Sequence, residues 1–565
     1  MTPEILTADV LIVGAGPVGL TMAMDLASRG VTVLIAEMRR YAEPPNVKCN
    51  HVASRTMEQF RRLGVAQKLR DAGLPADYPN DVVFRTSVTG IELTRIPIPC
   101  RRDRYTETEG PDAWWPTAEP PHRINQIYLE PILLEHAAAL PGVTLLNRTQ
   151  VKAFEQNARD EYGVAATALD LDDGSTRTLR ARFMVGCDGG ASPVRKQIGA
   201  KLEGTAVIQR VQSTYIRAPQ LRALIPGKPA WSYYSMNPRR CGTTFAIDGH
   251  ETWLVHNHLN AEEPEFDSVD RDTSIREILG VGPDFEYEVI SKEDWVGRRL
   301  VADRFRNGRV FLAGDAAHLW VPYAGYGMNA GIADAINLSW LLAACVQGWA
   351  DERILDAYEA ERQPITDQVS RFAMDHAQKM IRARRAVPAD IEAPGAKGDA
   401  LRADIGHEAY ELNVQQFCCA GLNYGYYYTG SPVIAYDDAT PPDYSMGSFT
   451  PSTVPGCRAP HFWLADGRSL YDAFGPAYTL LRFDRNVDVS ALQRDAAIAC
   501  MPLTVLDVGA SNVPHVPHVP PEYEHALVLC RADQHVMWRG NQIPQESAAL
   551  VARLCGRGVS SATAL

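Results

Sequence analysis

The chain opens with a hydrophobic run, a glycine-rich turn and a helical pattern. Residues Ala8–Val13 are mostly apolar, as in a strand that is buried on both faces. Gly14–Gly19 follows, and apolar residues then recur at the three- and four-residue spacing of a helix as far as Ala27. A β-branched run, Val31–Ala36, ends on Glu37. This order of patterns predicts a strand–helix–strand unit with parallel strands.

The turn after the first strand has the spacing Gly-x-Gly-x-x-Gly, at Gly14, Gly16 and Gly19. In a dinucleotide-binding unit the first glycine allows a tight turn, and the second lets the backbone approach a pyrophosphate. The third lets the helix pack on the strand, and the helix N-terminus faces the phosphates. Glu37 would accept hydrogen bonds from a ribose hydroxyl, as in NAD or FAD sites. The alternative is a glycine-rich turn of an unrelated α/β fold.

Two later stretches repeat the strand-then-turn pattern with an aspartate at the turn. In FMVGCDGGASPVR, residues 183–195, an apolar run leads into Asp188-Gly189. In RVFLAGDAAHLWVPYAGYGMN, residues 309–329, another apolar run leads into Gly314-Asp315. Burying a carboxylate is costly without a partner, so we expect Asp315 to have one, with helix capping as the simplest alternative role. A plain NAD dehydrogenase needs neither corner.

Between these two corners, residues 200–300 alternate aromatic and polar positions between turn signals, which predicts an antiparallel sheet. Core packing is the simpler role for any one of these aromatic side chains. His256 and His258 share a strand face, and His515 and His518 lie in a proline-rich loop. Neither pair has a carboxylate or cysteine nearby in sequence, so no metal site is predicted. The aromatic residues of the region include Tyr215, Trp231, Tyr233, Tyr234, Phe245 and Trp253.

Two long helical patterns follow the third corner. Ile332–Ala350 is apolar except for Asp334 and Asn337, and Asp351–Arg385 continues with helical spacing. Prolines, glycines and alanines in Ala386–Asp399 then predict a linker.

Composition narrows the class of protein. The chain has 565 residues, too many for one domain. A net charge of -12 argues against a nucleic-acid surface or a polybasic membrane patch. No apolar run reaches about 18 residues, so no membrane span is predicted, and the first apolar run lacks the basic start of a signal peptide. The 11 cysteines show no Cys-x-x-Cys spacing, which is typical of a reduced cytoplasmic protein.

Taken in order, the glycine turn with Glu37, the Asp188-Gly189 pair and the Gly314-Asp315 pair resemble the motifs of group A flavoprotein aromatic hydroxylases. This family includes p-hydroxybenzoate hydroxylase, phenol hydroxylase and 2,4-dichlorophenol 6-monooxygenase, and the likeness covers residues 8–385. It implies non-covalent FAD in the first strand–helix–strand unit and contact between Asp315 and the FAD ribitol. It also implies that the helix opening near Gly325 points its N-terminus at the N1/O2 edge of the flavin, where the reduced ring is anionic.

Other positions match the family one by one. Lys48 stands where relatives often carry an arginine near the FAD phosphates, Arg55 matches an arginine of their Arg-Thr-x-Glu segment, and Gln126 matches a glutamine near the flavin. A surface role is the alternative for these three residues. Asp188 and Arg195 match a motif that serves both FAD and NAD(P)H. The resemblance implies as cofactor-binding residues Gly14, Gly16, Pro17, Val18, Gly19, Glu37, Met38, Arg39, Lys48, Arg55, Gln126, Asp188, Gly189, Arg195, Gly314, Asp315, Pro322, Gly325, Gly327, Met328 and Asn329.

For catalysis, the resemblance points to Pro322, whose carbonyl would touch the reaction zone, to Gly325 and to His51. Relatives often have two prolines where this chain has Val321 and Pro322. Phenol hydroxylases often carry a histidine that helps to deprotonate the phenol, and the matching position here is Asn50. His51, the next residue, is the candidate that remains for this proton transfer.

The reaction implied by the resemblance is hydroxylation of a small phenolic or other electron-rich aromatic substrate with NAD(P)H and O2, through a C4a-hydroperoxyflavin. The alternatives are a tailoring oxygenase for an aromatic polyketide or larger natural product, a flavin reductase of the same fold, and a flavin-binding protein without turnover. The Trp-x-Trp-x-Ile-Pro segment of flavin-dependent halogenases is absent. No nucleic-acid or membrane partner is expected, and a homodimer is left open.

The predicted fold class is α/β: a Rossmann-like FAD-binding domain of the glutathione reductase type, an inserted antiparallel-sheet substrate domain, and a C-terminal thioredoxin-like domain. The last part resembles that of phenol hydroxylase, but Cys457, Cys500, Cys530 and Cys555 are scattered, so a packing role rather than redox exchange is expected. The predicted boundaries are 1–77, 121–198 and 299–385 for the FAD-binding domain, 78–120 and 199–298 for the substrate domain, 386–400 for the linker and 401–565 for the C-terminal domain.

Overall fold

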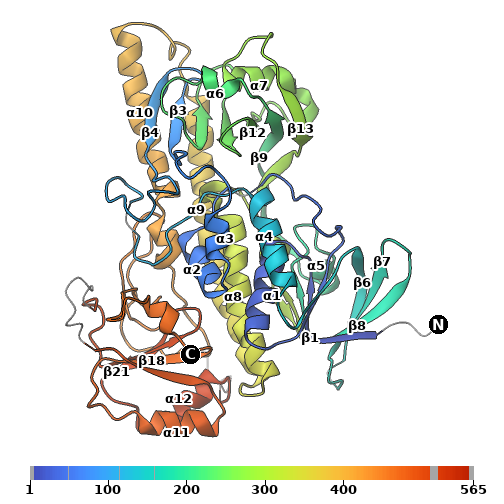
Figure 1. Cartoon of the computed structure of the whole chain (residues 1–565), viewed down its shortest axis with the longest axis vertical. Coiled ribbons are helices and arrows are strands. Elements are labelled where there is room, and N and C mark those ends of the chain that lie inside the picture. Colours follow the sequence, from blue (N-terminus) through green and yellow to red (C-terminus); the bar gives the residue numbers. More distant parts are fainter. Residues whose placement is uncertain (1–4, 49, 114, 158, 510–518, 559–565) are drawn as a thin grey trace.

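The structure is a computed structural model of the chain, and it describes residues 5–48, 50–113, 115–157, 159–509 and 519–558. His515 and His518, considered above for metal binding, lie outside the described residues. Figure 1 shows a central α/β body, a second sheet with its helices at the top, and a C-terminal body at the lower left.

The central body is built on an eight-stranded sheet whose core strands are parallel. The strand order is β15-β16-β8-β1-β2-β5, and β6 and β7 add an antiparallel hairpin beside β8. Because β16, β8 and β1 are parallel neighbours, the three turns that follow them meet at one edge of the sheet. The strands are β1 (Ile5–Val13), β2 (Val33–Ala36), β5 (Val143–Leu146), β6 (Thr149–Gln156), β7 (Val164–Asp170), β8 (Thr176–Gly186), β15 (Arg306–Asn307) and β16 (Val310–Leu312).

The predicted strand–helix–strand unit is present with shifted ends. β1 starts at Ile5, before the predicted Ala8, and β2 starts at Val33. α8 begins at Tyr326, next to the helix start expected near Gly325, and the apolar pattern noted from Ile332 is its continuation. The helices of this body are α1 (Pro17–Ser28), α2 (Ser54–Arg62), α3 (Ala66–Arg70), α4 (Gln126–Ala138), α5 (Pro193–Gln197) and α8 (Tyr326–Val346).

α8 is long and apolar enough, by length and composition, to cross a membrane. The sequence analysis predicted an apolar helix over most of this span but no membrane span, because Asp334 and Asn337 interrupt the apolar run. In the folded chain 89% of the most apolar window is buried inside the protein. α8 packs against α1 and α9 and is the central core helix, and its polar residues Asp334 and Asn337 are buried among partners.

The second body is a nine-stranded, mostly antiparallel sheet with the order β17-β14-β9-β12-β11-β10-β3-β4, and β13 pairs with β9. β3 and β4 come from segment 78–120, and β3 joins β10 in parallel. Helix α7 packs against β11 and β12. The elements are β3 (Val82–Arg85), β4 (Glu92–Ile96), β9 (Leu202–Arg217), β10 (Ser232–Ser235), β11 (Gly242–Ala246), β12 (Thr252–His258), β13 (Glu288–Lys292), β14 (Trp295–Ala302), β17 (His318–Trp320), α6 (Leu221–Leu224) and α7 (Arg271–Leu279).

Two long helices connect the bodies. α9 (Asp356–Arg385) runs from the central body up to the second sheet, as Figure 1 shows. α10 (Ala396–Phe417) begins inside the segment predicted as a linker and packs against β4. A Cβ at Gly406 would overlap the Leu93 carbonyl, so this glycine serves close helix–strand packing. The small residues here therefore reflect tight packing as well as a connection between domains.

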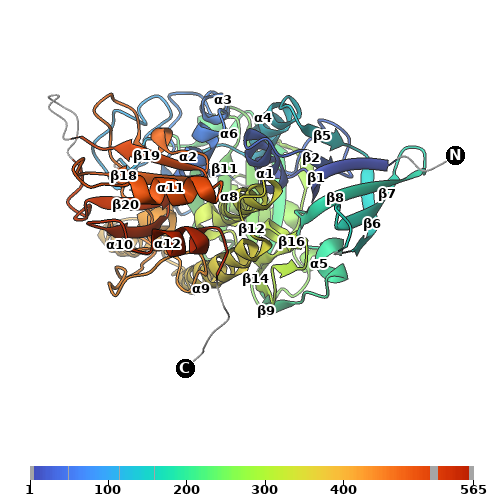
Figure 2. The same ribbon diagram turned by 90° about the horizontal axis from the view of Figure 1, so that it is seen from below.

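The C-terminal body follows α10 and contains a four-stranded sheet in the order β19-β18-β20-β21. β18 and β19 are parallel, and the other pairs are antiparallel. Figure 2 shows α11 and α12 side by side on this body. The elements are β18 (Tyr478–Arg482), β19 (Leu503–Asp507), β20 (Leu527–Arg531), β21 (Val536–Gly540), α11 (Ser490–Ile498) and α12 (Ser547–Leu554).

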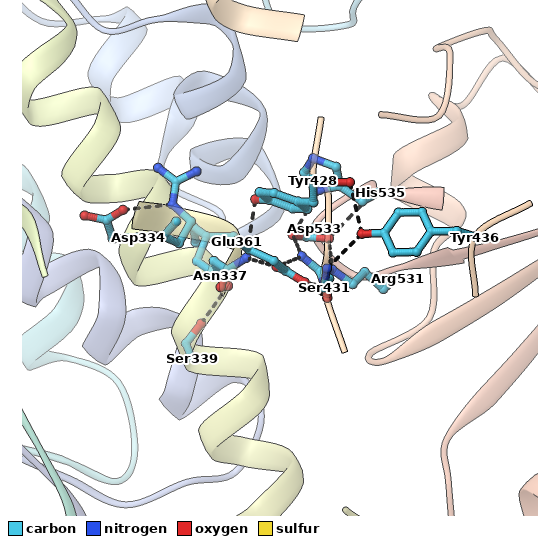
Figure 3. Close-up of polar contacts among 12 residues, drawn as sticks. Asp334, Asn337, Ser339, Glu361, Tyr428, Ser431, Tyr436, Arg531, Asp533 and His535 are labelled. Carbon is cyan, nitrogen blue, oxygen red and sulfur yellow. Dashed lines mark hydrogen bonds and ion pairs between the residues drawn. The ribbon is translucent and has the colours of Figure 1, made fainter. Parts of the chain in front are cut away.

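A buried ionic cluster ties this body to the core helices (Figure 3). Arg531, the last residue of β20, donates to the two carboxylate oxygens of Glu361 on α9 at 2.8 and 2.6 Å and to those of Asp533 at 2.6 and 2.7 Å. Glu361 also accepts a hydrogen bond of 2.7 Å from Asn337 on α8. Burial alone would raise the pKa of Asp533, but the neighbouring Arg531 and His535 have the larger effect and hold that pKa well below its usual range. Asp533 is therefore ionised, and the cluster links the C-terminal sheet to α8 through Glu361 and Asn337.

Candidate active site

The glycine turn after β1 has the geometry that its spacing predicts. Gly14 has φ +103°, and a Cβ there would overlap the Cys187 carbonyl. A Cβ at Gly19 would likewise overlap the Gly14 carbonyl, whereas a Cβ at Gly16, the N-cap of α1, would meet nothing within 4 Å. The fold therefore requires the first and third glycines, while the second faces open space at the helix N-terminus.

Glu37 lies at the end of β2, beside this turn. It accepts hydrogen bonds from the Ala15 N–H at 2.6 Å and from the Arg39 N–H at 2.8 Å. Burial alone would raise the pKa of Glu37, but Arg39 and the Ala15 N–H bring it below its usual value. Arg39 also contacts Glu130 at 2.5 Å, and Glu130 accepts from Gln126 at 2.7 Å. The structure thus joins Gln126 on α4 to Glu37 and Arg39 through one carboxylate.

The second turn is tied to the third. Asp188 accepts hydrogen bonds from the Ser192 hydroxyl at 2.5 Å and the Val194 N–H at 3.0 Å, so it shapes the entry to α5. Burial raises the pKa of Asp188 in spite of these bonds. Arg195 donates to the Gly190 carbonyl at 2.9 Å and to the Ala316 carbonyl at 3.0 Å. Its role in the structure is to hold the Asp188 turn against the Gly314-Asp315 turn.

Two aspartates at the third turn have opposite environments: Asp315 belongs to the turn, and Asp334 reaches it from α8. The carboxylate of Asp334 is buried, and it accepts from the Gly314 N–H at 3.2 Å, from His318 at 2.7 Å and from Arg362 at 2.8 Å. The Asp315 side chain is exposed, and we find no hydrogen-bond partner for it in the described part of the chain. The surrounding protein raises the pKa of Asp315, while His318 and Lys48 oppose this shift. The partner that the resemblance implies for Asp315 is the FAD ribitol, which stays a prediction, and the carboxylate that is paired within the protein behind this turn is that of Asp334.

The N-terminus of α8 closes the site. Gly325 is its N-cap with φ +62°, and a Cβ there would lie 2.9 Å from the His51 Cβ. Asn329 accepts from the Ala53 N–H at 2.8 Å and donates to the carbonyls of His51 at 3.1 Å and Gly325 at 2.6 Å. These bonds fix the segment before α2 against the turn of α8, so the first N–H groups of α8 have a defined direction.

His51 does not have the environment of a free base. The Arg123 guanidinium donates to His51 Nδ1, which occupies that lone pair. Burial lowers the pKa of His51 well below its usual range, and the charges of Arg123 and Arg104 lower it further. His51 is therefore neutral and weakly basic, and this geometry argues against its proposed part in taking the phenol proton.

The remaining candidates divide into two groups. The Lys48 side chain forms an ion pair with Glu293 and acts on the charge of Asp315, so it borders the site. Arg55 instead lies 4.5 Å from the centre of the Tyr426 ring and donates to the Asp533 carbonyl at 3.2 Å, so it faces the C-terminal body. Among the other candidates, Met38 and Pro322 are exposed and Met328 is buried. Gly327 lies beside the Trp320 indole. Pro17 is the first residue of α1, and Val18 is the second.

Three residues of the site escaped the sequence analysis. Arg123 contacts His51, Asp334 accepts a hydrogen bond from the Gly314 N–H of the third turn, and Arg362 donates to Asp334. A charged residue inside an apolar helix was the available signal for Asp334. Arg123 and Arg362 gave no such signal, because their partners are distant in sequence. In the described ranges no group of three or more histidine, cysteine or acidic side chains is placed to hold a metal ion.

Comparisons with known proteins agree with this geometry. Residues 7–373 match the protein family described as FAD binding domain. The chain belongs to this family of FAD enzymes. It is 30% identical to the FAD-dependent monooxygenase apdD of Emericella nidulans over 98% of this chain and 91% of the relative. It is 31% identical to aklavinone 12-hydroxylase RdmE of Streptomyces purpurascens over 96% of each chain. A solved structure of RebC with bound 7-carboxy-K252c superposes with a TM-score of 0.86 at 34% identity and covers 98% of this chain and 100% of RebC.

This FAD-dependent monooxygenase has side chains that fit its cofactor. The open space at Gly16 and the N-terminus of α1 suit a pyrophosphate. The carboxylate of Asp315 is exposed and has no hydrogen-bond partner among the described residues, which suits a sugar-alcohol chain. The N-terminus of α8 suits the edge of the flavin that becomes negative on reduction. FAD is the cofactor of the family, and NAD(P)H is its typical co-substrate. The individual contacts to FAD remain predictions.

Gly16→Val should weaken FAD binding to the monooxygenase about tenfold, the equivalent of roughly one backbone hydrogen bond. The open space admits the side chain without overlap, but the side chain then stands where the pyrophosphate must approach. Titration of the apoprotein with FAD and thermal melting by circular dichroism measure the two effects. Gly14→Ala is the matched variant: it should lower the melting temperature, because both φ and the Cys187 carbonyl oppose a Cβ there. Unchanged FAD affinity in Gly16→Val would remove that glycine from the cofactor site.

Proposed function

We propose that this monooxygenase hydroxylates a polycyclic aromatic compound, as in the tailoring of an aromatic polyketide or similar natural product. The observation that carries the proposal is a cavity of about 600 Å³ between the second sheet and the end of α9. Ligand cavities commonly enclose roughly 300–1,000 Å³, so this one has room for several fused rings. Its walls come from β9, the turn between β10 and β11, the end of β12, and residues 381–387.

An aromatic face of the sheet leads to this cavity. Ring centres are 5.4 Å apart for Trp231 and Phe245, 5.5 Å for Phe245 and His256, and 5.8 Å for His256 and Trp295. His258, the next residue on that face of β12, lines the cavity. A flat ring system would stack on such a face and displace water from it.

The cavity adjoins the turn that resembles the flavin turn of the family. Tyr323 directly follows Pro322, and its hydroxyl accepts a hydrogen bond of 3.2 Å from Arg384, which lines the cavity. Through this hydrogen bond, the wall of the cavity contacts the residue that follows Pro322. This proximity supports the assignment of Pro322 and Gly325 to the reaction zone.

When bound, FAD supplies the redox and oxygen-transfer chemistry of the reaction. The side chains must position the ring, exclude water and favour the phenolate, since the pKa of a free phenol is near ~10. Arg123 is a buried cation whose guanidinium lies 4.7 Å from the centre of the Trp231 ring. It forms no ion pair with a carboxylate in the described residues, so its charge can favour a phenolate on the aromatic face. In this proposal Arg123 favours the phenolate by its charge, and it takes the role that the sequence analysis suggested for His51 as a base.

Two of the relatives support a large substrate. Aklavinone 12-hydroxylase and RebC match almost the whole chain, including the second sheet and the C-terminal body. A simple phenol, the first substrate class suggested by the sequence, would leave most of the cavity filled with water. A reductase without oxygen transfer has no need of an aromatic face.

The finer architecture belongs to the same proposal. A four-stranded mixed sheet with two helices supports a thioredoxin-like C-terminal domain. Each of the ten cysteines in the described residues is a free thiol, which supports a structural rather than a redox role for that domain. The proposal keeps the domain boundaries given above, except that the linker ends before Ala396, where α10 begins. It also includes a cytoplasmic location and NAD(P)H, O2 and a small aromatic molecule as the ligands of the enzyme.

Substrate-stimulated oxidation of NAD(P)H tests the function. Purified FAD-loaded protein is mixed with a panel of mono-, bi- and polycyclic phenols, and oxygen incorporation is followed by mass spectrometry with ¹⁸O2. We expect polycyclic phenols to stimulate oxidation and to gain one oxygen atom from O2. Stimulation by single-ring phenols alone would favour simple phenol hydroxylation. Oxidation without incorporation of ¹⁸O by any compound would contradict the hydroxylase function.

A further inference from the structure

We infer that the substrate carries an acidic group, such as an aryl carboxylate, and that Arg384 in the large cavity binds this group. The inference rests on the proposed function and narrows its substrate class. Arg384 lies near the C-terminal end of α9, where the helix meets the second sheet.

Other arginines of the cavity wall are paired with carboxylates, whereas Arg384 is not. Arg239 contacts both carboxylate oxygens of Glu392 at 2.5 and 3.0 Å, and Arg240 contacts both oxygens of Glu263 at 2.9 Å. Arg384 and Arg210, by contrast, have no carboxylate within 4.0 Å among the residues that the structure describes, and of the two it is Arg384 whose guanidinium is held in place by hydrogen bonds to neutral partners. The arginines that line the cavity are Arg210, Arg239, Arg240, Arg384 and Arg385.

The contacts of Arg384 are neutral and incomplete. It donates to the Tyr323 hydroxyl at 3.2 Å and to the Gln209 side-chain oxygen at 2.6 Å. A guanidinium has about five N–H donors, and the described residues supply acceptors for only these two bonds. The remaining donors are free to form a bidentate contact, which is the geometry that a carboxylate accepts. Gln209 and Tyr323 hold the guanidinium in place for such a contact.

The charge of Arg384 acts on the groups around the cavity. It lowers the pKa of His258, which burial already holds well below its usual range, so this histidine is neutral and does not compete for an anion. The chain as a whole carries a net charge of -12, yet this part of the wall has an unneutralised cation. The acidic residues of the wall, Glu262 and Glu263, are paired with Arg385 and Arg240, so the charge of Arg384 is left to attract an anionic ligand. A neutral ligand would cover the cation without compensating for the water it displaces.

The position of Arg384 also defines the shape of the ligand. Because Tyr323 separates Arg384 from Pro322, the acidic group and the reacting carbon cannot occupy the same place. The substrate must therefore hold its acid on a different ring, or on a side arm, from the carbon that is hydroxylated. Fused rings provide such a separation rigidly.

Binding of a matched pair of ligands tests the inference. The probes are a hydroxynaphthoic acid, with hydroxyl and carboxyl groups on opposite rings, and its neutral methyl ester. Perturbation of the flavin absorbance of the FAD-loaded enzyme reports binding without turnover. The acid should bind about 10- to 100-fold more tightly than the ester, as expected for one charge-assisted contact. In Arg384→Gln this preference should disappear, with FAD content unchanged, and Arg384→Lys should retain part of it.

Arg382→Gln is the matched control, because Arg382 is exposed on the same helix and does not line the cavity. It should keep the preference of the parent enzyme. Equal binding of acid and ester by the parent, or a preference that survives Arg384→Gln, would overturn the inference. It would also fall if Arg384→Gln weakened binding of adenosine diphosphate ribose instead of the acid, since the anion would then belong to the co-substrate. Preferential binding of the acid without its hydroxylation would contradict the proposed function and leave this inference standing.

Discussion

Arg531→Leu should lower the free energy of unfolding by about 3–5 kcal/mol, the usual effect of removing one partner from a buried ion pair. Arg531 is fully buried and contacts all four carboxylate oxygens of Glu361 and Asp533. Its loss leaves two negative charges inside the protein without a cation. Urea unfolding, followed by tryptophan fluorescence, measures the change.

Arg482→Leu is the matched control for this prediction. Arg482 lies on the neighbouring strand β18 and contacts both oxygens of Asp507 at 2.6 and 3.0 Å, but this pair is at the surface. Its removal should change stability by only about 0–1 kcal/mol. Equal losses in the two variants would show that burial of the Arg531 cluster does not govern its contribution. Replacing Arg531, Glu361 and Asp533 together by apolar residues should restore much of the loss, because no charge is then left unpaired.

Asp315→Ala should weaken FAD binding about 10- to 100-fold, equivalent to one charge-assisted hydrogen bond of roughly 1.5–3 kcal/mol. The exposed carboxylate lies at the turn where β16, β8 and β1 end together. Since it has no hydrogen-bond partner in the described residues, its removal should not disturb the fold. Fluorescence quenching of FAD on titration with apoprotein gives the dissociation constant, and acid precipitation of the loaded enzyme should release free FAD.

Asp375→Ala controls for the loss of a carboxylate at the surface. Asp375 forms an exposed pair with Lys379 on α9, far from the three turns in sequence and on another element. FAD affinity should be unchanged in this variant. If Asp315→Ala also bound FAD like the parent, the ribitol contact implied by the family resemblance would be wrong.

Local motifs made the cofactor domain predictable from sequence. Gly14, Gly16 and Gly19 occur within one turn; the first and third are required sterically by the fold, and the second leaves open space at the helix N-terminus. Asp188 and Gly314 likewise follow short apolar strands, so their turns could be placed without knowledge of the fold. The family resemblance then supplied the order of the three turns.

Long-range pairing made the rest unpredictable. Arg55 matched a family motif, but its partners are Tyr426 and residues of the 533–535 turn, which no local pattern connects to α2. His51 looked like a base until Arg123 was found at its Nδ1. Asp315 and Asp334 have similar apolar neighbours in sequence, and only the tertiary structure shows which one is buried.

Helix α10 illustrates the same limit at the level of domains. Small residues between 386 and 400 have the composition of a linker, and the structure uses two nearby glycines for packing instead: Gly398 against the Ala393 carbonyl and Gly406 against the Leu93 carbonyl. Composition cannot separate a flexible connection from a close backbone approach, because both favour residues without bulky side chains.

The ionic cluster of Figure 3 has a consequence for biosynthesis. Glu361 and Asn337 belong to the core helices, but the cation that neutralises Glu361 lies near the end of the chain, at Arg531. A ribosome that has completed α8 and α9 has therefore made an FAD-binding core whose buried acid still lacks its counterion. The core helices can settle into their final packing only after β20 has emerged. Loading of FAD should accordingly follow release of the finished chain, and a ribosome-stalled chain ending before β20 should be colourless.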